Sequence, residues 1–157
     1  MFIARGNLLD APFQFIAHQV NCYGVMGAGV ALQIRNKYPE VYNAYKTFCN
    51  IYTVKSPLGK SLCVWTKDNH CIINVFGQLG YGRAQQQTDY DALYSGFATA
   101  AEEIRDTFLN GNPRYQIPIA IPYGIGCGLA GGDWDKVKEV LELVEKNHCV
   151  LFIACKI

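Results

Sequence analysis

Two glycine-rich segments, each placed directly after an apolar run, constrain this chain more than any other feature of its sequence. The first follows the apolar residues 15–20 and contains Gly24, Gly27 and Gly29, and the second covers residues 122–134. Glycine permits unusual backbone conformations and removes side chains that would keep a ligand away from the main chain. We therefore expect both segments to present backbone amides to an anion such as a phosphate or a pyrophosphate.

The order of predicted elements indicates one α/β domain over residues 1–157. Strands are expected at residues 2–4, 15–20, 61–66, 71–76, 117–121 and 149–154, and helices at 29–37, 39–49, from 88 and from 133 or 135. Strands that alternate with helices favour a central, mainly parallel sheet covered by helices on both faces. A hairpin at residues 67–70 makes the sheet mixed, and both glycine segments are expected at one sheet edge.

Charge and cysteine content exclude several classes of protein. The formal charge is +1, from 14 basic and 13 acidic residues, so the surface offers no long-range attraction to nucleic acid. The seven cysteines lack the spacing of a zinc site, and we expect no metal and no cofactor. Free thiols predict a reducing cytoplasm. We expect no signal peptide, no membrane span and a monomer.

Three polar residues near the glycine segments are candidates for chemistry. His18 lies in the strand before the first segment, where a histidine is either a structural residue or a proton-transfer group. Asn21 either shapes the turn or binds sugar hydroxyls, and we favour the latter. Asp133 either caps the last helix or orients an attacking water. Residues 76–83 form either a surface loop or a flap in which Tyr81 or Arg83 contacts the ligand.

The combination of motifs resembles the macrodomain family, a module that binds ADP-ribose. The motifs are Arg5-Gly6-Asn7-Leu8-Leu9, residues 17–21 running into Met26-Gly27-Ala28-Gly29-Val30-Ala31, and Ile125-Gly126-Cys127-Gly128-Leu129. This resemblance implies a three-layer α/β/α fold. It is closest to the branch of the terminal ADP-ribose glycohydrolases and the ADP-ribose 1''-phosphate phosphatases.

The resemblance also implies residue roles. It places Asn7, Leu8 and Leu9 beside the adenosine, Asn21 at the distal ribose, and Gly27, Ala28, Gly29, Val30, Gly124, Ile125, Gly126, Cys127, Gly128 and Leu129 around the distal ribose and the pyrophosphate. His18 falls where a phosphatase of this branch has a histidine implicated in catalysis.

The chain departs from the glycohydrolase pattern at two positions. It has Gln78 and Leu79 where the glycohydrolases carry a catalytic lysine, and Ala130 where they carry an aspartate. We therefore expect hydrolysis of ADP-ribose 1''-phosphate, with His18 and Asp133 as the catalytic residues. The alternatives are a non-catalytic ADP-ribose reader, and a hydrolase that removes ADP-ribose from modified protein or nucleic acid.

Overall fold

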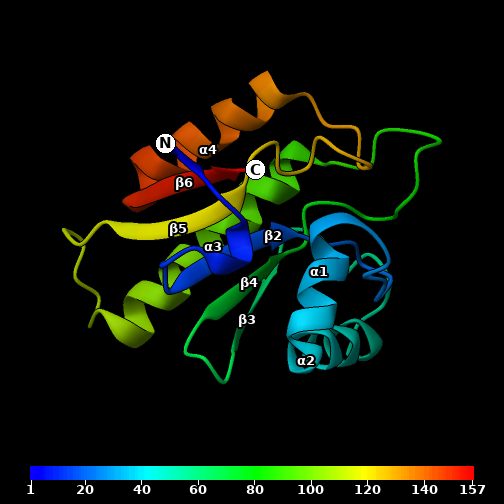
Figure 1. The fold of residues 1–157 in the computed structure, drawn as a ribbon, viewed down its shortest axis with the longest axis horizontal. Coiled ribbons are helices and arrows are strands. Elements are labelled where there is room, and N and C mark those ends of the chain that lie inside the picture. The colour runs from blue at the N-terminus through cyan, green and yellow to red at the C-terminus, as the bar shows by residue number, and fades with distance from the viewer.

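The computed structural model describes residues 1–157 and is built around a six-stranded sheet (Figure 1). The strands are β1 (Phe2–Arg5), β2 (Phe15–Gln19), β3 (Ser61–Trp65), β4 (Cys71–Val75), β5 (Ile117–Pro122) and β6 (Val150–Lys156). They lie in the order β1-β6-β5-β2-β4-β3. Every neighbouring pair is parallel except β3 and β4, which form the expected hairpin. The prediction of a mixed, mainly parallel sheet is confirmed.

Helices cover both faces of this sheet and complete the three layers. They are α1 (Gly29–Lys37), α2 (Pro39–Ile51), α3 (Tyr90–Phe108) and α4 (Trp134–His148), with a short 3-10 helix η1 (Leu8–Asp10) after β1. Because side chains alternate along a strand, Ala17 packs in the core under α3 and α4, whereas Ile16 packs under α1 and α2. None of the helices has both the length and the apolarity that crossing a bilayer requires.

The start of α3 differs from the expectation by two residues. The helix begins at Tyr90, and its N-cap is Asp89, whose carboxylate accepts a hydrogen bond from the Ala92 amide at 2.9 Å. Thr88, at which the helix was expected to begin, is buried and donates its hydroxyl hydrogen to the carbonyl oxygen of Gly126. The side chain of Thr88 therefore contacts the second glycine segment, and the helix begins two residues later.

The carboxyl ends of three neighbouring strands bring three loops to one edge of the sheet, on the right in Figure 1. The first glycine loop (residues 20–28) follows β2, the second (residues 123–133) follows β5, and a third loop (residues 76–89) follows β4. Since β5, β2 and β4 are adjacent and parallel, these loops are neighbours. The expectation that both glycine segments share one edge is confirmed.

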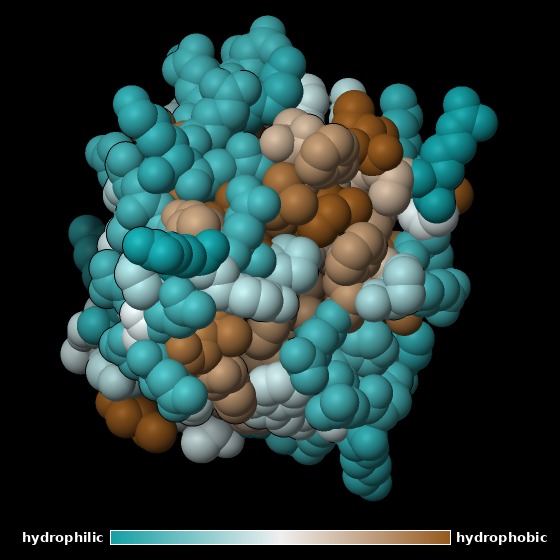
Figure 2. Space-filling view, turned by 90° about the vertical axis from the view of Figure 1, so that its left-hand side faces the viewer, coloured by the Kyte–Doolittle hydropathy of each residue, from teal (hydrophilic) through white to brown (hydrophobic).

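The opposite edge carries the amino ends of these strands and closes the core. Figure 2 shows this side of the molecule, where hydrophobic residues gather in the middle of a largely hydrophilic face. Here Trp65 packs against Phe15 and Phe108, with ring centroids 6.1 and 5.1 Å apart. The aromatic rings thus seal the end of the sheet that lies away from the glycine loops.

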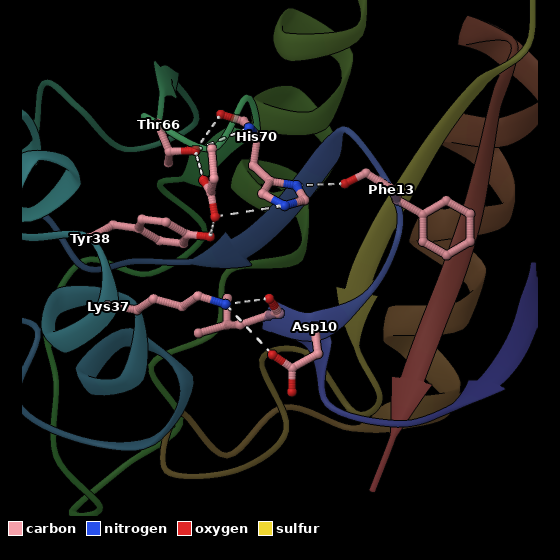
Figure 3. A network of polar contacts seen from close by, with 8 residues as sticks. Asp10, Phe13, Lys37, Tyr38, Thr66 and His70 are labelled. Atoms are coloured by element: carbon pink, nitrogen blue, oxygen red, sulfur yellow. Dashed lines mark hydrogen bonds and ion pairs between the residues drawn. The ribbon is translucent and has the colours of Figure 1, made fainter.

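Polar contacts fix the end of α1 that is farthest from the glycine loops (Figure 3). The hydroxyl of Tyr38 donates to Asp68 at 2.8 Å, and the ammonium of Lys37 donates to the carbonyl oxygen of Leu9 at 2.7 Å. Hydrogen bonds from Thr66 and Tyr38 lower the pKa of the Asp68 carboxyl. The network ties α1 to η1 and to the β3–β4 hairpin, so the orientation of the helix is set by its far end.

Candidate functional site

A cavity of about 760 Å³ lies between the three loops at the carboxyl edge. Both glycine loops and the β4–α3 loop contribute to its wall. The lining residues are His18, Gln19, Val20, Asn21, Val25, Gly27, Ala28, Gly29, Val30, Ala31, Gln78, Tyr81, Gly82, Arg83, Pro122, Tyr123, Gly124, Ile125, Gly126, Gly128, Leu129 and Ala130. A cavity of this size can hold a small organic ligand.

The first glycine loop supplies a run of backbone amides without protein partners. None of the amides of residues 27–31 donates a hydrogen bond, because α1 begins at Gly29 and its first turn has no acceptor within the helix. Ala28, at the N-cap position, also provides no side-chain cap. Gly29 has a φ of 56°, a conformation that glycine adopts without strain. The positive end of the helix dipole and these amides together favour an anion at this wall.

The second glycine loop presents a matching set of amides. Alternate residues pair within the loop, for example Ile125 N with Pro122 O at 3.1 Å and Cys127 N with Gly124 O at 2.9 Å. This pairing leaves other amides of the loop unpaired, namely those of Gly124, Gly126, Gly128, Leu129 and Ala130. All of these residues line the cavity. An extended anion with two phosphates can therefore accept hydrogen bonds from both sides.

Asn21 is held in place by contacts on both ends of its carboxamide. Its Oδ1 accepts from the amide of Tyr23 at 3.0 Å and from the hydroxyl of Tyr45 at 2.9 Å. Its Nδ2 donates to the carbonyl oxygen of Val25 at 2.8 Å, which leaves one N–H for a ligand. Asn21 is thus a turn residue that also forms part of the cavity wall, and its binding of sugar hydroxyls stays a prediction.

Tyr45, which the sequence analysis did not single out, organises the first glycine loop from behind. This residue of α2 is fully buried, lies outside the cavity wall, and contacts Asn21 O at 2.7 Å as well as Asn21 Oδ1. Its ring packs on Phe76, with centroids 5.8 Å apart. In the sequence it is one apolar position of an amphipathic helix, and that pattern carries no signal of a polar role.

His18 lines the cavity but is almost completely buried. Its Nε2 lies 2.7 Å from Oδ1 of Asn74, whose own Nδ2 donates to Leu62 O, so Nε2 carries the hydrogen. Nδ1 has no hydrogen-bond partner and is shielded from bulk solvent. Burial lowers the pKa of His18 to about 4, although the bond to Asn74 works in the opposite direction. At neutral pH the ring is therefore neutral, with a free acceptor at Nδ1.

Gln19 joins the three loops and was also missed as a site residue. Its Nε2 donates to Gln78 Oε1 at 2.8 Å and to the hydroxyl of Thr88 at 3.0 Å. A Cβ at Gly126 would approach Gln19 Oε1 to 2.8 Å, so this glycine is needed for close contact as well as for its φ of 74°. The signal in the sequence was a glutamine that follows His18 at the end of a largely apolar strand.

Several predicted residues lie outside the cavity wall. The side chain of Asn7 accepts from the Leu9 amide at 2.9 Å, while Leu8 and Leu9 are buried in the core. Cys127 belongs to the second loop but does not line the cavity. Asp133 accepts from the amides of Asp135 and Lys136 at 2.8 and 3.4 Å, which is the arrangement of a helix cap.

The charges around the cavity are few. Arg83 is the one lysine or arginine that lines it, and no aspartate or glutamate does. Burial raises the pKa of the Cys22 thiol to about 12 and that of the Cys127 thiol to about 11, so neither is a thiolate at neutral pH. No group of three or more His, Cys, Asp or Glu residues is arranged to hold a metal ion.

Comparison with known families and relatives agrees with this geometry. The family model of the Macro domain matches residues 17–141. A Mycobacterium tuberculosis protein named DNA ADP-ribosyl glycohydrolase is 33% identical over 140 residues, which cover 87% of this chain but 36% of that protein. The chain thus spans little more than a third of that relative. A Saccharomyces cerevisiae ADP-ribose 1''-phosphate phosphatase is 26% identical, with 88% of this chain and 89% of that protein covered.

Solved structures give the same result. The macrodomain of Mycobacterium tuberculosis DarG superposes with a TM-score of 0.77 at 28% identity, and the match covers 99% of this chain and 97% of that one. Thermosipho africanus DarTG, solved in complex with ADP-ribose, has a TM-score of 0.72 at 19% identity, with 99% of this chain and 42% of that chain covered. The second likeness concerns the fold alone.

Proposed function

This chain belongs to the Macro domain family, and from that premise we propose that it binds ADP-ribose 1''-phosphate and hydrolyses its terminal phosphomonoester. The observation that carries the proposal is the cavity walled on two sides by unpaired backbone amides. A diphosphate fits between two such walls, and a nucleotide-sized ligand fits the volume of about 760 Å³.

Asn21 and the flanking amides are the groups we assign to the distal half of the ligand. Asn21 keeps one free N–H, which can donate to a hydroxyl of the distal ribose. Neighbouring amides of both loops can then donate to a phosphate on that ribose. Amides that are already oriented before the reaction stabilise charge that grows on phosphate oxygens in the transition state.

In the proposed reaction, water attacks the terminal phosphorus. A new P–O bond forms, the bond between phosphorus and the oxygen on C1'' breaks, and that oxygen leaves with the electron pair. ADP-ribose takes a proton at this oxygen, and inorganic phosphate is released. We assign the proton acceptor for the attacking water to Nδ1 of His18, a neutral imidazole nitrogen without a partner. Because Nδ1 is shielded, this role requires the cavity wall to open slightly when the ligand binds.

The composition of the wall favours this reaction over a lysine-dependent one. Gln78 lies where the resemblance to the glycohydrolases implies a lysine, and its amide is engaged with Gln19 and Gly80. No lysine lines the cavity from any other element. Asp133 is assigned to stability, because its carboxylate already accepts two amide hydrogens at the start of α4.

Phosphate release from ADP-ribose 1''-phosphate tests the proposal. Wild-type protein is expected to release phosphate, and His18→Ala to lower kcat by about 100-fold or more, the usual contribution of a general base. Asp133→Ala serves as the matched comparison: it should keep kcat within about threefold while destabilising the fold by about 1 kcal/mol through loss of the cap. No phosphate release by the wild type, at any concentration that saturates binding, refutes the proposed reaction.

The relatives named DNA ADP-ribosyl glycohydrolase favour a second candidate, removal of ADP-ribose from modified DNA. Wild-type protein is to be incubated with ADP-ribosylated DNA and, in parallel, with ADP-ribosylated protein. Release of ADP-ribose from DNA, without release of phosphate from ADP-ribose 1''-phosphate, selects this candidate. Tight calorimetric binding of ADP-ribose without turnover of any of the three substrates selects a non-catalytic reader.

A further inference from the structure

We propose that Arg83 and the groove beside it form an anion subsite that makes this protein prefer ADP-ribose with a terminal phosphate over ADP-ribose itself. This proposal rests on the proposed function for the identity of the main ligand. It adds a site and a residue that set the relative affinity for two ligands differing by one phosphate.

The subsite is a second hollow that adjoins the main cavity. It has a volume of about 650 Å³ and lies between the β4–α3 loop and the end of the second glycine loop. Arg83, Gly128 and Leu129 line both hollows, and Gln85 and Gln86 line the groove alone. A ligand group that passes Arg83 therefore moves directly from the cavity into the groove.

The charge distribution points to an anion. Arg83 is the one lysine or arginine around the two hollows, and no carboxylate lines either. The guanidinium makes no hydrogen bond and no ion pair with the protein, so all its N–H groups are free. A guanidinium can bind a phosphate through two parallel hydrogen bonds, which makes it more selective than a point charge.

Neutral donors next to Arg83 fit the same ligand. The amides of Gly128 and Leu129 have no protein acceptor, and these residues form the wall that the two hollows share. The carboxamide of Gln85 is exposed and has no hydrogen-bond partner in the protein, whereas Gln86 is engaged with the carbonyl oxygen of Thr88. A terminal phosphate can thus accept from a cation, from main-chain amides and from one side-chain amide.

The topology places this subsite at the distal end of the ligand. Arg83 and Asn21 line the same cavity, whereas β1 lies at the far end of the strand order. The β4–α3 loop reaches across to the second glycine loop, where the amides of Gln87 and Thr88 donate to Ala130 O at 2.7 and 3.2 Å. We assign Asn21 to the distal ribose, and the resemblance of the sequence places the adenosine near β1. The group attached to the distal ribose is therefore the one that reaches Arg83.

Calorimetric binding of two ligands tests the subsite. One is ADP-ribose, and the other is a phosphonate analogue of ADP-ribose 1''-phosphate in which a methylene group blocks hydrolysis. Arg83→Gln should weaken binding of the phosphonate by about tenfold and change ADP-ribose binding by less than about twofold. Arg83→Lys should retain part of the preference, because it keeps the charge and loses the paired geometry.

Arg114→Gln is the matched control, since it removes the same charge from an exposed arginine between α3 and β5, outside both hollows. It should leave both affinities unchanged. Equal losses for the two ligands in Arg83→Gln, or no loss for either, overturn the subsite. Failure of the proposed function is a different result: wild type then binds the phosphonate with the Arg83 preference but releases no phosphate from the natural ester.

Discussion

At the scale of single residues, the site combines side chains that are tied down with one that is free. Asn21 is bound to the protein through both Oδ1 and Nδ2, and Gln19 through both hydrogens of Nε2. Arg83, by contrast, has no partner, and His18 keeps one ring nitrogen unpaired. Groups that are fixed by the protein lose little conformational freedom when a ligand binds, which favours affinity.

The buried imidazole of His18 predicts a pH dependence of stability. Its pKa is about 4 in the folded protein, against an ordinary value of 6.5, so the unfolded chain takes up a proton that the folded chain excludes. The free energy of unfolding should therefore fall as the pH drops from about 6.5 to about 4, by up to about 3 kcal/mol in total from this residue. Above the ordinary pKa both states are neutral and the effect vanishes.

Urea unfolding of wild type and His18→Asn between about pH 7.5 and about pH 4.5 measures this contribution. As the pH falls, the free energy of unfolding should decrease more for wild type than for the variant, because the variant has no imidazole to protonate. Carboxylates elsewhere destabilise both proteins alike at low pH, so they cancel. A difference that stays constant over the range contradicts a buried neutral imidazole.

At the scale of elements, the first glycine loop is shaped by α2 as well as by the strand that precedes it. The hydroxyl of Tyr45 contacts both oxygens of Asn21, and Asn21 in turn holds Tyr23 and Val25. α1 begins at the cavity and is fixed at its other end by the contacts of Lys37 and Tyr38. The loop therefore depends on two helices for its conformation.

Tyr45→Phe tests this dependence. The variant keeps the ring on Phe76 but removes the donor to the buried carbonyl oxygen of Asn21 and one of the donors to its Oδ1, so we expect a loss of about 1–3 kcal/mol in the free energy of unfolding. ADP-ribose binding should weaken about five- to tenfold, and binding of ADP, which has no distal ribose, should weaken less. Calorimetry with both ligands measures the difference.

Tyr42→Phe provides the control, because Tyr42 lies one turn earlier on α2, is partly buried, and its hydroxyl has no hydrogen-bond partner. It should change neither stability nor affinity. If Tyr45→Phe lowers stability but weakens ADP and ADP-ribose equally, Tyr45 supports the fold without positioning Asn21.

At the scale of the whole molecule, the position of the cavity follows from the topology, and this part was accessible from the sequence. Apolar runs such as residues 15–20 and 117–121 indicated buried strands, and glycine segments after them indicated loops at one edge. The roles of Tyr45 and Gln19 were not accessible, because their partners lie far away along the chain. A partner that is distant along the chain also explains why α3 does not begin at Thr88 as expected: the side chain of Thr88 binds Gly126 across the edge.

The low net charge predicts how binding responds to salt. With a formal charge of +1 and a single arginine at the cavity, attraction of the ligand depends on short-range hydrogen bonds. The affinity for ADP-ribose should fall by less than about threefold between about 50 mM and about 300 mM NaCl. Calorimetry at several salt concentrations measures this, and a loss of tenfold or more would mean that a basic surface outside the cavity takes part.

The unpaired donors of residues 27–31 and of the second loop belong to the main chain, so only some experiments can detect their contribution. Alanine scanning removes side chains, so it leaves every one of these donors in place and will rank the loops as unimportant. Replacing single peptide bonds by esters, which deletes one N–H at a time, probes them directly. The same property has a consequence for evolution: neighbouring side chains can be exchanged for new chemistry while the main-chain amides stay available to an anion.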